Sequence, residues 1–223
     1  MDGPCSFEEI RACLRDLSLV NRITFAYRPT MAWLDRLAQA APLPNPLRIV
    51  DVGCGYGDML RHIEGWARDR GIAFELIGID LNEDAVRAAR EATPTGSAIQ
   101  WIAGNVYELV TEADLIISSL VTHHLTEDEI VRFLQWMERT ARVGWFINDL
   151  HRKAMPYYAF STLMRGPWWH RFIRADGMTS IRRSFLEQDW ERMLAVAGLA
   201  PNAVDGTLAV VGYRPARLCV ERS

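Results

Sequence analysis

Short apolar runs alternate with amphipathic segments along the middle of the chain. The runs are nearly continuous in apolar side chains, which is typical of parallel strands buried on both faces. Segments with helical periodicity separate them, at 58–70, from Asn82 onward and at 126–141. This alternation predicts a parallel sheet covered by helices. The strand-like runs are LRIVDVG (47–53), FELIGID (74–80), IQWIAGN (99–105), DLIISSL (114–120) and WFINDL (145–150).

Amphipathic patterns also flank this core. Residues 6–40 predict two helices, because Ser6 and Glu9 match a capping box and Pro29 interrupts the pattern. Residues 184–199 predict another helix. The tail predicts two closing strands joined by a turn at Arg214-Pro215, namely TLAVVGY (207–213) and ARLCVER (216–222).

Size, charge and cysteine use narrow the picture. With 223 residues, 49% of them hydrophobic, the chain can bury one core, and we expect a single domain. The formal charge of −3 provides no global field for nucleic acid, so we expect no nucleic-acid partner. The four cysteines lack CxxC spacing, which predicts reduced thiols and no metal site. No apolar run of membrane-spanning length occurs, and we expect a cytoplasmic protein.

The chemistry begins after the first strand-like run, where residues 49–58 read IVDVGCGYGD. Gly53, Gly55 and Gly57 let the backbone turn sharply and let a ligand approach the main chain closely. In open α/β sheets, ligands bind outside the carboxyl ends of the strands, which is where this loop falls. A dinucleotide fingerprint, GxGxxG, would need a glycine in place of Asp58, so the pattern disfavours a nicotinamide cofactor.

This stretch resembles motif I of the class I S-adenosylmethionine (SAM) dependent methyltransferases, in which a hydrophobic strand ends in an acid and is followed by GxGxG. The resemblance implies SAM as cofactor and S-adenosylhomocysteine (SAH) as product. It also implies an α/β, Rossmann-like fold with a seven-stranded, mostly parallel sheet and helices on both faces. We expect one methyltransferase domain over 1–223, made of an N-terminal helical cap (1–46), a SAM-binding core (47–150), a helical lid insertion after strand five (151–183), and a closing helix and strands (184–223).

The resemblance also assigns residues to the cofactor. The three glycines, Gly53, Gly55 and Gly57, would pass under the methionine part, and Asp51 would orient its amino end. Asp80 ends the second strand, where a carboxylate accepts both ribose hydroxyls. The other contacts would come from Leu81 and Ile79 around the adenine, from Asn105 and Val106 beside it, and from Ser119. Family members usually carry an acid where Asn105 stands, and capping of the local loop is the alternative role for its amide.

Two further stretches narrow the resemblance. Residues 118–129, SSLVTHHLTEDE, look like the segment after the fourth strand in small-molecule methyltransferases of the ubiquinone/menaquinone-biosynthesis type. The opening helices, over 16–37, and the phrase FINDLHR (146–152) look like bacterial members associated with polyketide or phenolic-lipid pathways. We therefore expect a small-molecule acceptor that is aromatic or polyketide-like.

Three histidines fall at the ends of the fourth and fifth strands: His123, His124 and His151. Histidine suits a general base for a phenol or enol near neutral pH. We favour His124 or His123, and His151 paired with Asp149 on the same face of a strand is the second candidate. Alternatively, one histidine of the adjacent pair caps the following helix. The chain lacks an (Asn/Asp)-Pro-Pro-aromatic motif and a Pro-Cys pair here, which favours methylation of oxygen or carbon.

The interval 152–183 is basic and aromatic, with seven Arg or Lys residues and a single acid, Asp176. We expect a lid over an aromatic acceptor, to which Tyr158, Trp168 and, from the first helices, Tyr27 would contribute. The alternatives are a surface that meets lipid headgroups at a membrane and a pair of surface helices packed on the core. Both a monomer and a dimer are compatible with the sequence.

The leading hypothesis is a SAM-dependent methyltransferase that acts on an oxygen or carbon of a phenolic, polyketide or quinone-like small molecule. One alternative is an RNA methyltransferase, in which the basic interval would be the nucleic-acid footprint. Another is a SAM-fold protein that binds cofactor or partner without turnover. A dehydrogenase is the most distant alternative, and NADH binding would distinguish it.

Overall fold

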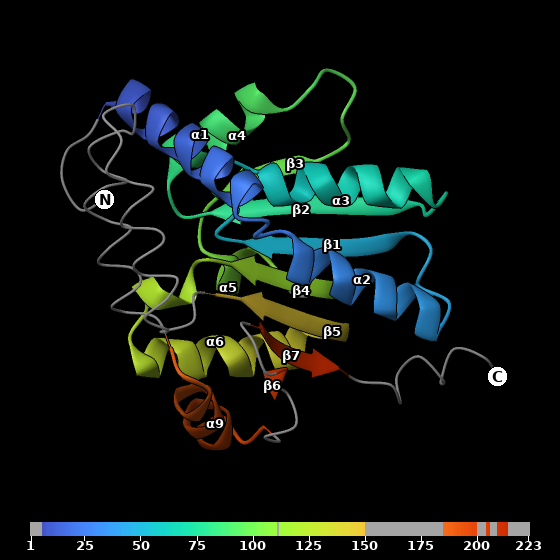
Figure 1. Cartoon of the computed structure of the whole chain (residues 1–223), viewed down its shortest axis with the longest axis vertical. Helices are drawn as coiled ribbons and strands as arrows, with labels where there is room; N and C mark the ends of the chain where they lie inside the picture. Colours follow the sequence, from blue (N-terminus) through green and yellow to red (C-terminus); the bar gives the residue numbers. More distant parts are fainter. Residues whose placement is uncertain (1–5, 111, 150–184, 200–203, 206–208, 214–223) are drawn as a thin grey trace.

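The computed structural model describes residues 6–110, 112–149, 185–199, 204–205 and 209–213. A seven-stranded sheet in the order β3-β2-β1-β4-β5-β7-β6 forms its centre (Figure 1). Strands β1 to β5 are parallel, and β7 runs antiparallel to both of its neighbours. The predicted Rossmann-like α/β fold is confirmed. The strands are β1 (Leu47–Val52), β2 (Phe74–Asp80), β3 (Gln100–Ala103), β4 (Ala113–Ser119), β5 (Ala141–Asn148), β6 (Val204–Asp205) and β7 (Ala209–Tyr213).

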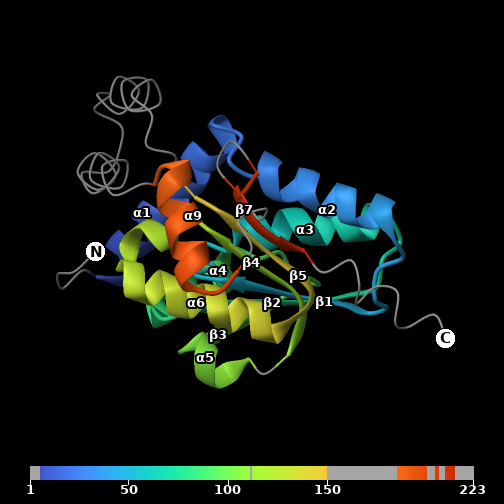
Figure 2. The ribbon, with the colours of Figure 1, turned by 90° about the horizontal axis from the view of Figure 1, so that it is seen from below.

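Helices cover both faces of the sheet (Figure 2). Helices α2, α3 and α4 share a core with one face, and α5, α6 and α9 share a core with the other. Helix α1 lies against α4 through a smaller, separate cluster. The helices are α1 (Phe7–Ile23), α2 (Arg28–Ala40), α3 (Asp58–Asp69), α4 (Glu83–Ala92), α5 (Val106–Leu109), the 3-10 turn η1 (Thr122–His124), α6 (Glu127–Thr140) and α9 (Glu187–Val196).

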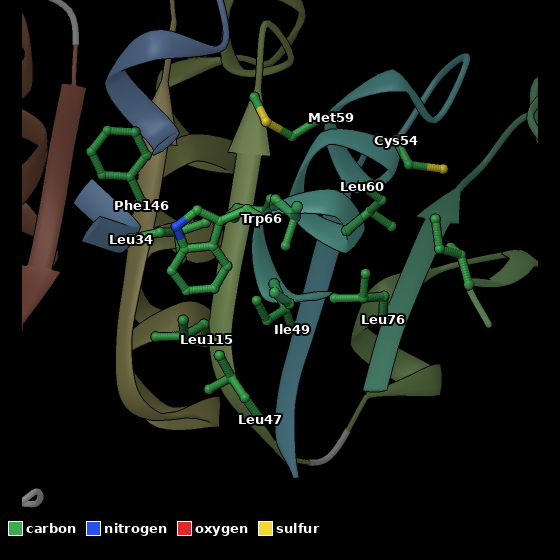
Figure 3. Packing of buried hydrophobic residues seen from close by; sticks show 14 of the residues in the cluster. Leu34, Leu47, Ile49, Cys54, Met59, Leu60, Trp66, Leu76, Leu115 and Phe146 are labelled. Atoms are coloured by element: carbon green, nitrogen blue, oxygen red, sulfur yellow. The ribbon is translucent and has the colours of Figure 1, made fainter. Parts of the chain in front are cut away.

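The core on the α3 side of the sheet is shown in Figure 3. Strand side chains point to opposite faces in turn, so Ile49 of β1 enters this core while Val50 enters the one on the α6 side. Both side chains are fully buried, and burial of each contributes roughly 1.5–3 kcal/mol to stability. The alternation places Asp51, at the end of β1, on the α3 side.

The N-terminal segment folds as the predicted helical cap. Ser6 Oγ accepts the N–H of Glu9 at 3.3 Å, and Glu9 Oε2 accepts the N–H of Ser6 at 3.1 Å, which completes the capping box. Pro29 lies in the first turn of α2, where its missing N–H costs no helical hydrogen bond. The cluster between α1 and α4 is built from Ile10, Leu14, Ala85 and Ala88.

The strand order reverses at β1. From β1 the chain passes to β2 and β3 on one side, and then to β4 and β5 on the other. The helices that follow β1 and β4 therefore cover opposite faces, since α3 lies on one and α6 on the other. Such a topological switch point is where open α/β sheets bind ligands, at the carboxyl ends of the strands.

The structure corrects two of the predicted strands. Strand β5 begins at Ala141, earlier than the run WFINDL, because α6 ends at Thr140 and passes directly into the strand. Strand β7 matches the predicted run TLAVVGY, but its partner on the outer side is β6, which precedes it in the chain. The segment predicted for that role, 216–222, lies outside the described residues.

None of the described helices has both the length and the apolar character needed to cross a membrane. The predicted lid insertion, 151–183, lies outside the described residues, as does its predicted contact with a membrane. The division of the chain into cap, core, lid and closing segments stays a prediction.

Candidate active site

The loop after β1 is tied to the end of β2 by its backbone. Gly53 and Cys54 donate their N–H groups to the carbonyl oxygen of Ile79, at 2.8 and 3.1 Å. Gly53, Gly55 and Gly57 have φ values of +71°, +51° and +75°. These values lie in the left-handed region that favours glycine, so the spacing of the motif follows from the backbone path.

The three glycines differ in what surrounds them. A Cβ atom on Gly53 would lie 2.4 Å from Cγ2 of Val121, and one on Gly57 would lie 2.3 Å from Cη2 of Trp101. Packing of these neighbours therefore requires glycine at both positions. A Cβ atom on Gly55 would meet a single atom of α1, at an ordinary contact distance of 3.7 Å. Gly55 is the glycine beside which the loop leaves space for a ligand.

Asp80, at the end of β2, braces this loop. One carboxylate oxygen accepts the N–H of Gly55 at 3.0 Å, and the other accepts the N–H of Asn82 at 2.9 Å. Asn82 in turn caps α4 by accepting two backbone N–H groups. An ionised carboxylate offers about four lone-pair positions, so both oxygens of Asp80 can accept further bonds. Asp80 is thus a fixed acceptor at the switch point.

Three carboxylates interact around the loop: Asp51, Asp58 and Asp80. Burial raises the pKa of Asp51, which is 2% exposed, and the charges of Asp58 and Asp80 raise it further. Arg61, on α3, interacts with Asp58 and donates to the carbonyl of the residue before Gly57 at 2.8 Å. A positively charged ligand group would relieve the repulsion that Asp51 experiences. The cluster therefore suits a cationic ligand.

Cys54 lies within the same loop. Its thiol is buried, and burial together with the nearby carboxylates Asp51 and Asp80 raises its pKa. The thiol therefore stays protonated, and a nucleophilic role for Cys54 does not follow from its surroundings. Its labelled side chain lies above Leu60 in the core on the α3 side (Figure 3).

The residues predicted around the adenine are placed differently from one another. Ile79 is 1% exposed and packs in the core on the α6 side, so its predicted contact with adenine is wrong. Asn105 caps α5, where its side chain accepts the N–H of Tyr107 at 3.2 Å and donates to Glu108 at 3.1 Å. Val106, the first residue of α5, is buried in the same core as Ile79. The structure thus shows the capping role that was the alternative for Asn105.

Leu81 and Ser119 lie at the ends of β2 and β4. Leu81 is 78% exposed, directly after Asp80. The hydroxyl oxygen of Ser119 is buried and has no hydrogen-bond partner in the described part of the chain. Buried polar groups are nearly always paired, so this hydroxyl at the switch point is a candidate contact for a bound ligand. Ser119 shares its side of the sheet with Ile117 and hence with Asp51.

His123 and Asp149 form a buried pair at the ends of β4 and β5. Nδ1 of His123 lies 2.7 Å from Oδ1 of Asp149, and the two residues are 5% and 3% exposed. Oδ2 of Asp149 accepts the backbone N–H of His123 at 3.1 Å and the hydroxyl of Thr122. An ionised carboxylate only accepts, so Nδ1 of His123 carries the proton and Nε2 is the acceptor nitrogen.

His124 is placed differently from its neighbour. It is exposed, and its ring lies tilted against the ring of His123 with the centroids 4.2 Å apart. Neither histidine caps α6, because Thr126 does so in a capping box with Glu129. The capping role considered for these histidines is therefore wrong. His123 pairs with Asp149 in the described structure, whereas His151, the histidine predicted to pair with it, lies outside the described residues.

Tyr27, predicted to contact the acceptor, is buried between the cap and α3. Its hydroxyl lies 2.5 Å from Oδ2 of Asp58 and 3.1 Å from the carbonyl of Ser18, and its ring stacks on His62 with the centroids 4.1 Å apart. Burial and the charge of Asp58 raise the pKa of Tyr27. Tyr27 therefore fastens the cap to α3. The other predicted acceptor contacts, Tyr158 and Trp168, lie outside the described residues.

Two polar residues of this region were not anticipated from the sequence. Thr122 is fully buried and bonds Asp149 through its hydroxyl. The side chain of Asn148 donates from Nδ2 to the carbonyl of Ala26 at 2.8 Å, and the main-chain carbonyl of Asn148 accepts the N–H of Leu120 at 2.8 Å. The sequence contains little indication of these roles. Thr122 and Asn148 are distinguished only as polar residues that directly precede the predicted site residues His123 and Asp149.

Comparison with known proteins agrees with this geometry. Residues 49–144 match the family model described as "Methyltransferase domain". The chain is 24% identical over 166 residues to demethylmenaquinone methyltransferase of Bacillus licheniformis, which covers 74% of this chain and 69% of that protein. It is 27% identical over 164 residues to the non-reducing polyketide synthase esdpA of Penicillium shearii. That match covers 71% of this chain but spans only 7% of the synthase.

A solved structure shows the same fold. The SAM-dependent methyltransferase from Aquifex aeolicus matches with a TM-score of 0.55 at 17% identity, over 80% of this chain and 87% of that one. The segment that matches the family model contains the glycine loop, Asp80 and the turn with His123. Residues 49–144 therefore resemble a methyltransferase domain, which agrees with the family, the enzyme class and the SAM cofactor predicted from the glycine loop.

Proposed function

We propose that the protein transfers the methyl group of SAM to an oxygen or carbon of a small aromatic, polyketide-like or quinone-like acceptor, with His123 as the general base. The observation that carries this proposal is the buried His123–Asp149 pair at the carboxyl ends of β4 and β5, next to the glycine loop. Val121, two residues before His123, packs against Gly53, so the turn with the base and the loop for the cofactor touch.

The residues around the loop fit SAM. Gly55 leaves space at the main chain, and both oxygens of Asp80 can accept further hydrogen bonds, which suits the ribose hydroxyls. The carboxylate of Asp51 suits the cationic amino end, and the unpaired hydroxyl of Ser119 can donate to a polar group of the cofactor. Leu81, exposed beside Asp80, would cover the adenine. When bound, SAM supplies an activated methyl group on a sulfonium.

The protein's own chemical task is then to position the acceptor and remove its proton. Asp149 fixes the imidazole of His123 so that Nε2 accepts the proton of a hydroxyl or an activated carbon, and the carboxylate stabilises the imidazolium that forms. Thr122 holds Asp149 through its second oxygen, which keeps the pair aligned. Because His123 is only 5% exposed, the acceptor must enter the site, which favours a small molecule.

The two sequence relatives support the choice of acceptor class. One is named for methylation of demethylmenaquinone, a quinone, and the other is a polyketide synthase. At 24% and 27% identity, neither identifies the acceptor of this protein. Both names nonetheless agree with an acceptor that carries an acidic hydroxyl or carbon, for which a histidine base is suited.

Transfer of radiolabelled methyl from SAM to a panel of phenols, hydroxynaphthoquinones and 1,3-diketones tests the proposal. His123→Gln should lower kcat by about 10²-fold or more while SAM affinity is kept, since it removes the base and leaves the cofactor loop intact. His124→Gln, at the exposed neighbouring histidine, is the matched control and should stay close to wild type.

Equal effects of the two histidine variants would contradict the role of His123. If His123→Gln fails to fold, Asp149→Asn serves instead, because an amide cannot hold the same tautomer and should also lower kcat. If SAM binds but no acceptor is methylated, a binding protein without turnover is favoured. Salt-sensitive binding of RNA would favour the RNA methyltransferase instead.

A further inference from the structure

The turn between α1 and α2 contains an aromatic residue where a glycine is expected. Helix α1 ends at Ile23, is capped by Thr24 and closes in a Schellman motif. In this motif Phe25 donates its N–H to Arg22 O at 3.4 Å and Ala26 donates to Asn21 O at 2.9 Å. The residue after the cap then takes a left-handed conformation, and glycine is usual there. This chain has Phe25 in that place, with φ of +56°.

Phe25 is not part of any buried cluster among the described residues. Its side chain is 56% exposed, and Leu19 and Ile23, in the last turns of α1, are 47% and 48% exposed. Non-glycine residues in the left-handed region persist where the surrounding structure holds them, and they gather at functional sites. An exposed phenylalanine in a glycine position therefore points to a ligand that uses the ring.

The turn is anchored beside the proposed base. Asn148, at the end of β5, donates from Nδ2 to the carbonyl of Ala26, the residue after Phe25, at 2.8 Å. The main-chain carbonyl of Asn148 accepts the N–H of Leu120. Leu120 has a φ of +60° and is, with Phe25, one of the two described non-glycine residues with a positive φ. Asp149 follows Asn148 directly and holds His123. Leu120 and the residue after Phe25 thus both bond to Asn148, directly before the aspartate that holds the base.

A cation accompanies the exposed ring. The guanidinium of Arg28, in the first turn of α2, lies over the ring of Phe25, 4.1 Å from its centroid. Within the described part of the chain, no carboxylate forms an ion pair with Arg28. A planar guanidinium on an aromatic face can still bind a carboxylate through its N–H groups, and stacking pre-organises it for that contact.

We propose that Phe25 and Arg28 form the acceptor-recognition surface and select an aromatic acceptor that carries a carboxylate. The ring of the acceptor would pack on Phe25, and its carboxylate would meet Arg28. The inference rests on the proposed function, because it assigns the substrate class of the same site. It differs from that function in its test, since it concerns binding of the acceptor and not transfer of the methyl group.

The experiment uses the full chain saturated with SAH, and calorimetric titration with two matched probes, 6-hydroxy-2-naphthoate and the uncharged 2-naphthol. Wild type should bind the naphthoate at least tenfold more tightly. Arg28→Gln should remove this preference. Arg87→Gln is the matched control, because the guanidinium of Arg87 also lies over a phenylalanine ring, 3.8 Å from the centroid of Phe7. This pair joins α4 to α1, away from the turn that contains Phe25. Arg87→Gln should leave both affinities unchanged.

Phe25→Gly separates a binding role from a structural one. Glycine suits the left-handed position, so the variant should melt at a higher temperature than wild type. Loss of the ring should at the same time weaken both probes about tenfold or more. Stability and affinity are therefore expected to change in opposite directions, which a residue kept for packing would not produce.

Several outcomes would overturn the proposal. They are equal affinity of wild type for the two probes, absence of binding of either probe, equal effects of Arg28→Gln and Arg87→Gln, and a Phe25→Gly variant that melts lower with its affinities unchanged. Sedimentation of wild type, but not of Phe25→Gly, with phosphatidylglycerol vesicles in the absence of probe binding would assign the surface to a membrane instead. Failure of SAH to bind in the first step would count against the proposed function itself.

Discussion

Replacing Gly55 by alanine should remove SAM binding and leave the fold intact. The added methyl group would project into the space that the glycine loop leaves open, where its nearest described neighbour is a Leu14 atom at 3.7 Å. The same substitution at Gly71, in the turn after α3, adds a methyl group with nothing within 4 Å. Gly71 has a similar φ, +64° against +51°, so the two variants carry a similar backbone strain.

The magnitudes follow from these surroundings. An L-residue in the left-handed region costs roughly 1–2 kcal/mol, and neither variant adds a steric clash. For a chain of this size, 1 kcal/mol lowers the melting temperature by about 2–4 °C, so both variants should melt roughly 2–8 °C below wild type. The methyl group at Gly55 should additionally weaken SAM at least tenfold, which corresponds to about 1.4 kcal/mol.

Thermal melting and calorimetric titration with SAM measure the two effects separately. Gly57→Ala provides the opposite control, because its Cβ would lie 2.3 Å from the ring of Trp101 and should destabilise the fold more than either of the others. The reasoning would be refuted if Gly55→Ala bound SAM as tightly as Gly71→Ala. In that event the open side of Gly55 would not face the cofactor.

Three further substitutions test separate parts of the structure. Asp51→Asn should raise stability at about pH 8, because burial and neighbouring acids raise the folded-state pKa of Asp51 and its ionised form costs stability there. In thermal melts the gain should shrink towards about pH 5. The same variant should bind SAM more weakly. Thr122→Val should lower kcat and shift the pH–rate profile with SAM affinity kept, since it removes one of the hydrogen bonds that hold Asp149; an unchanged profile would speak against a positioning role. Tyr27→Phe should destabilise the fold by about 1.5–3 kcal/mol in urea unfolding, because it removes a hydrogen bond to the charged Asp58. An unchanged free energy of unfolding would mean that this hydrogen bond does not stabilise the fold.

The parallel sheet could be predicted because its strands are short apolar runs separated by helical periodicity. The start of β5 could not, since the residues from Ala141 follow α6 without a turn signal. The two-residue strand β6 is too short to show any alternation, and its partner was therefore sought on the wrong side of β7. These errors concern boundaries and pairings, which depend on contacts with other elements.

The site shows the same division between local and distant information. The glycine loop follows from a motif that is continuous in the sequence, and Asp80 follows from its place at the end of the next strand-like run. The choice between His123 and His124 depends on which side chain meets Asp149, 26 residues away, and sequence spacing does not reveal that. The hydrogen bond of Tyr27 involves Asp58, which lies in α3, and sequence spacing does not reveal that contact either. The glycine motif alone also could not distinguish Gly55 from the two glycines that packing requires.

Calorimetric titration of the purified wild-type chain with SAM, SAH and NADH tests the central claim most directly. The open side of Gly55, the free acceptor positions of Asp80 and the acidic cluster around Asp51 predict that SAM and SAH bind and that NADH gives no signal. If NADH bound and neither sulfur ligand did, the glycine loop would serve a different cofactor, and methyl transfer by this protein would be contradicted.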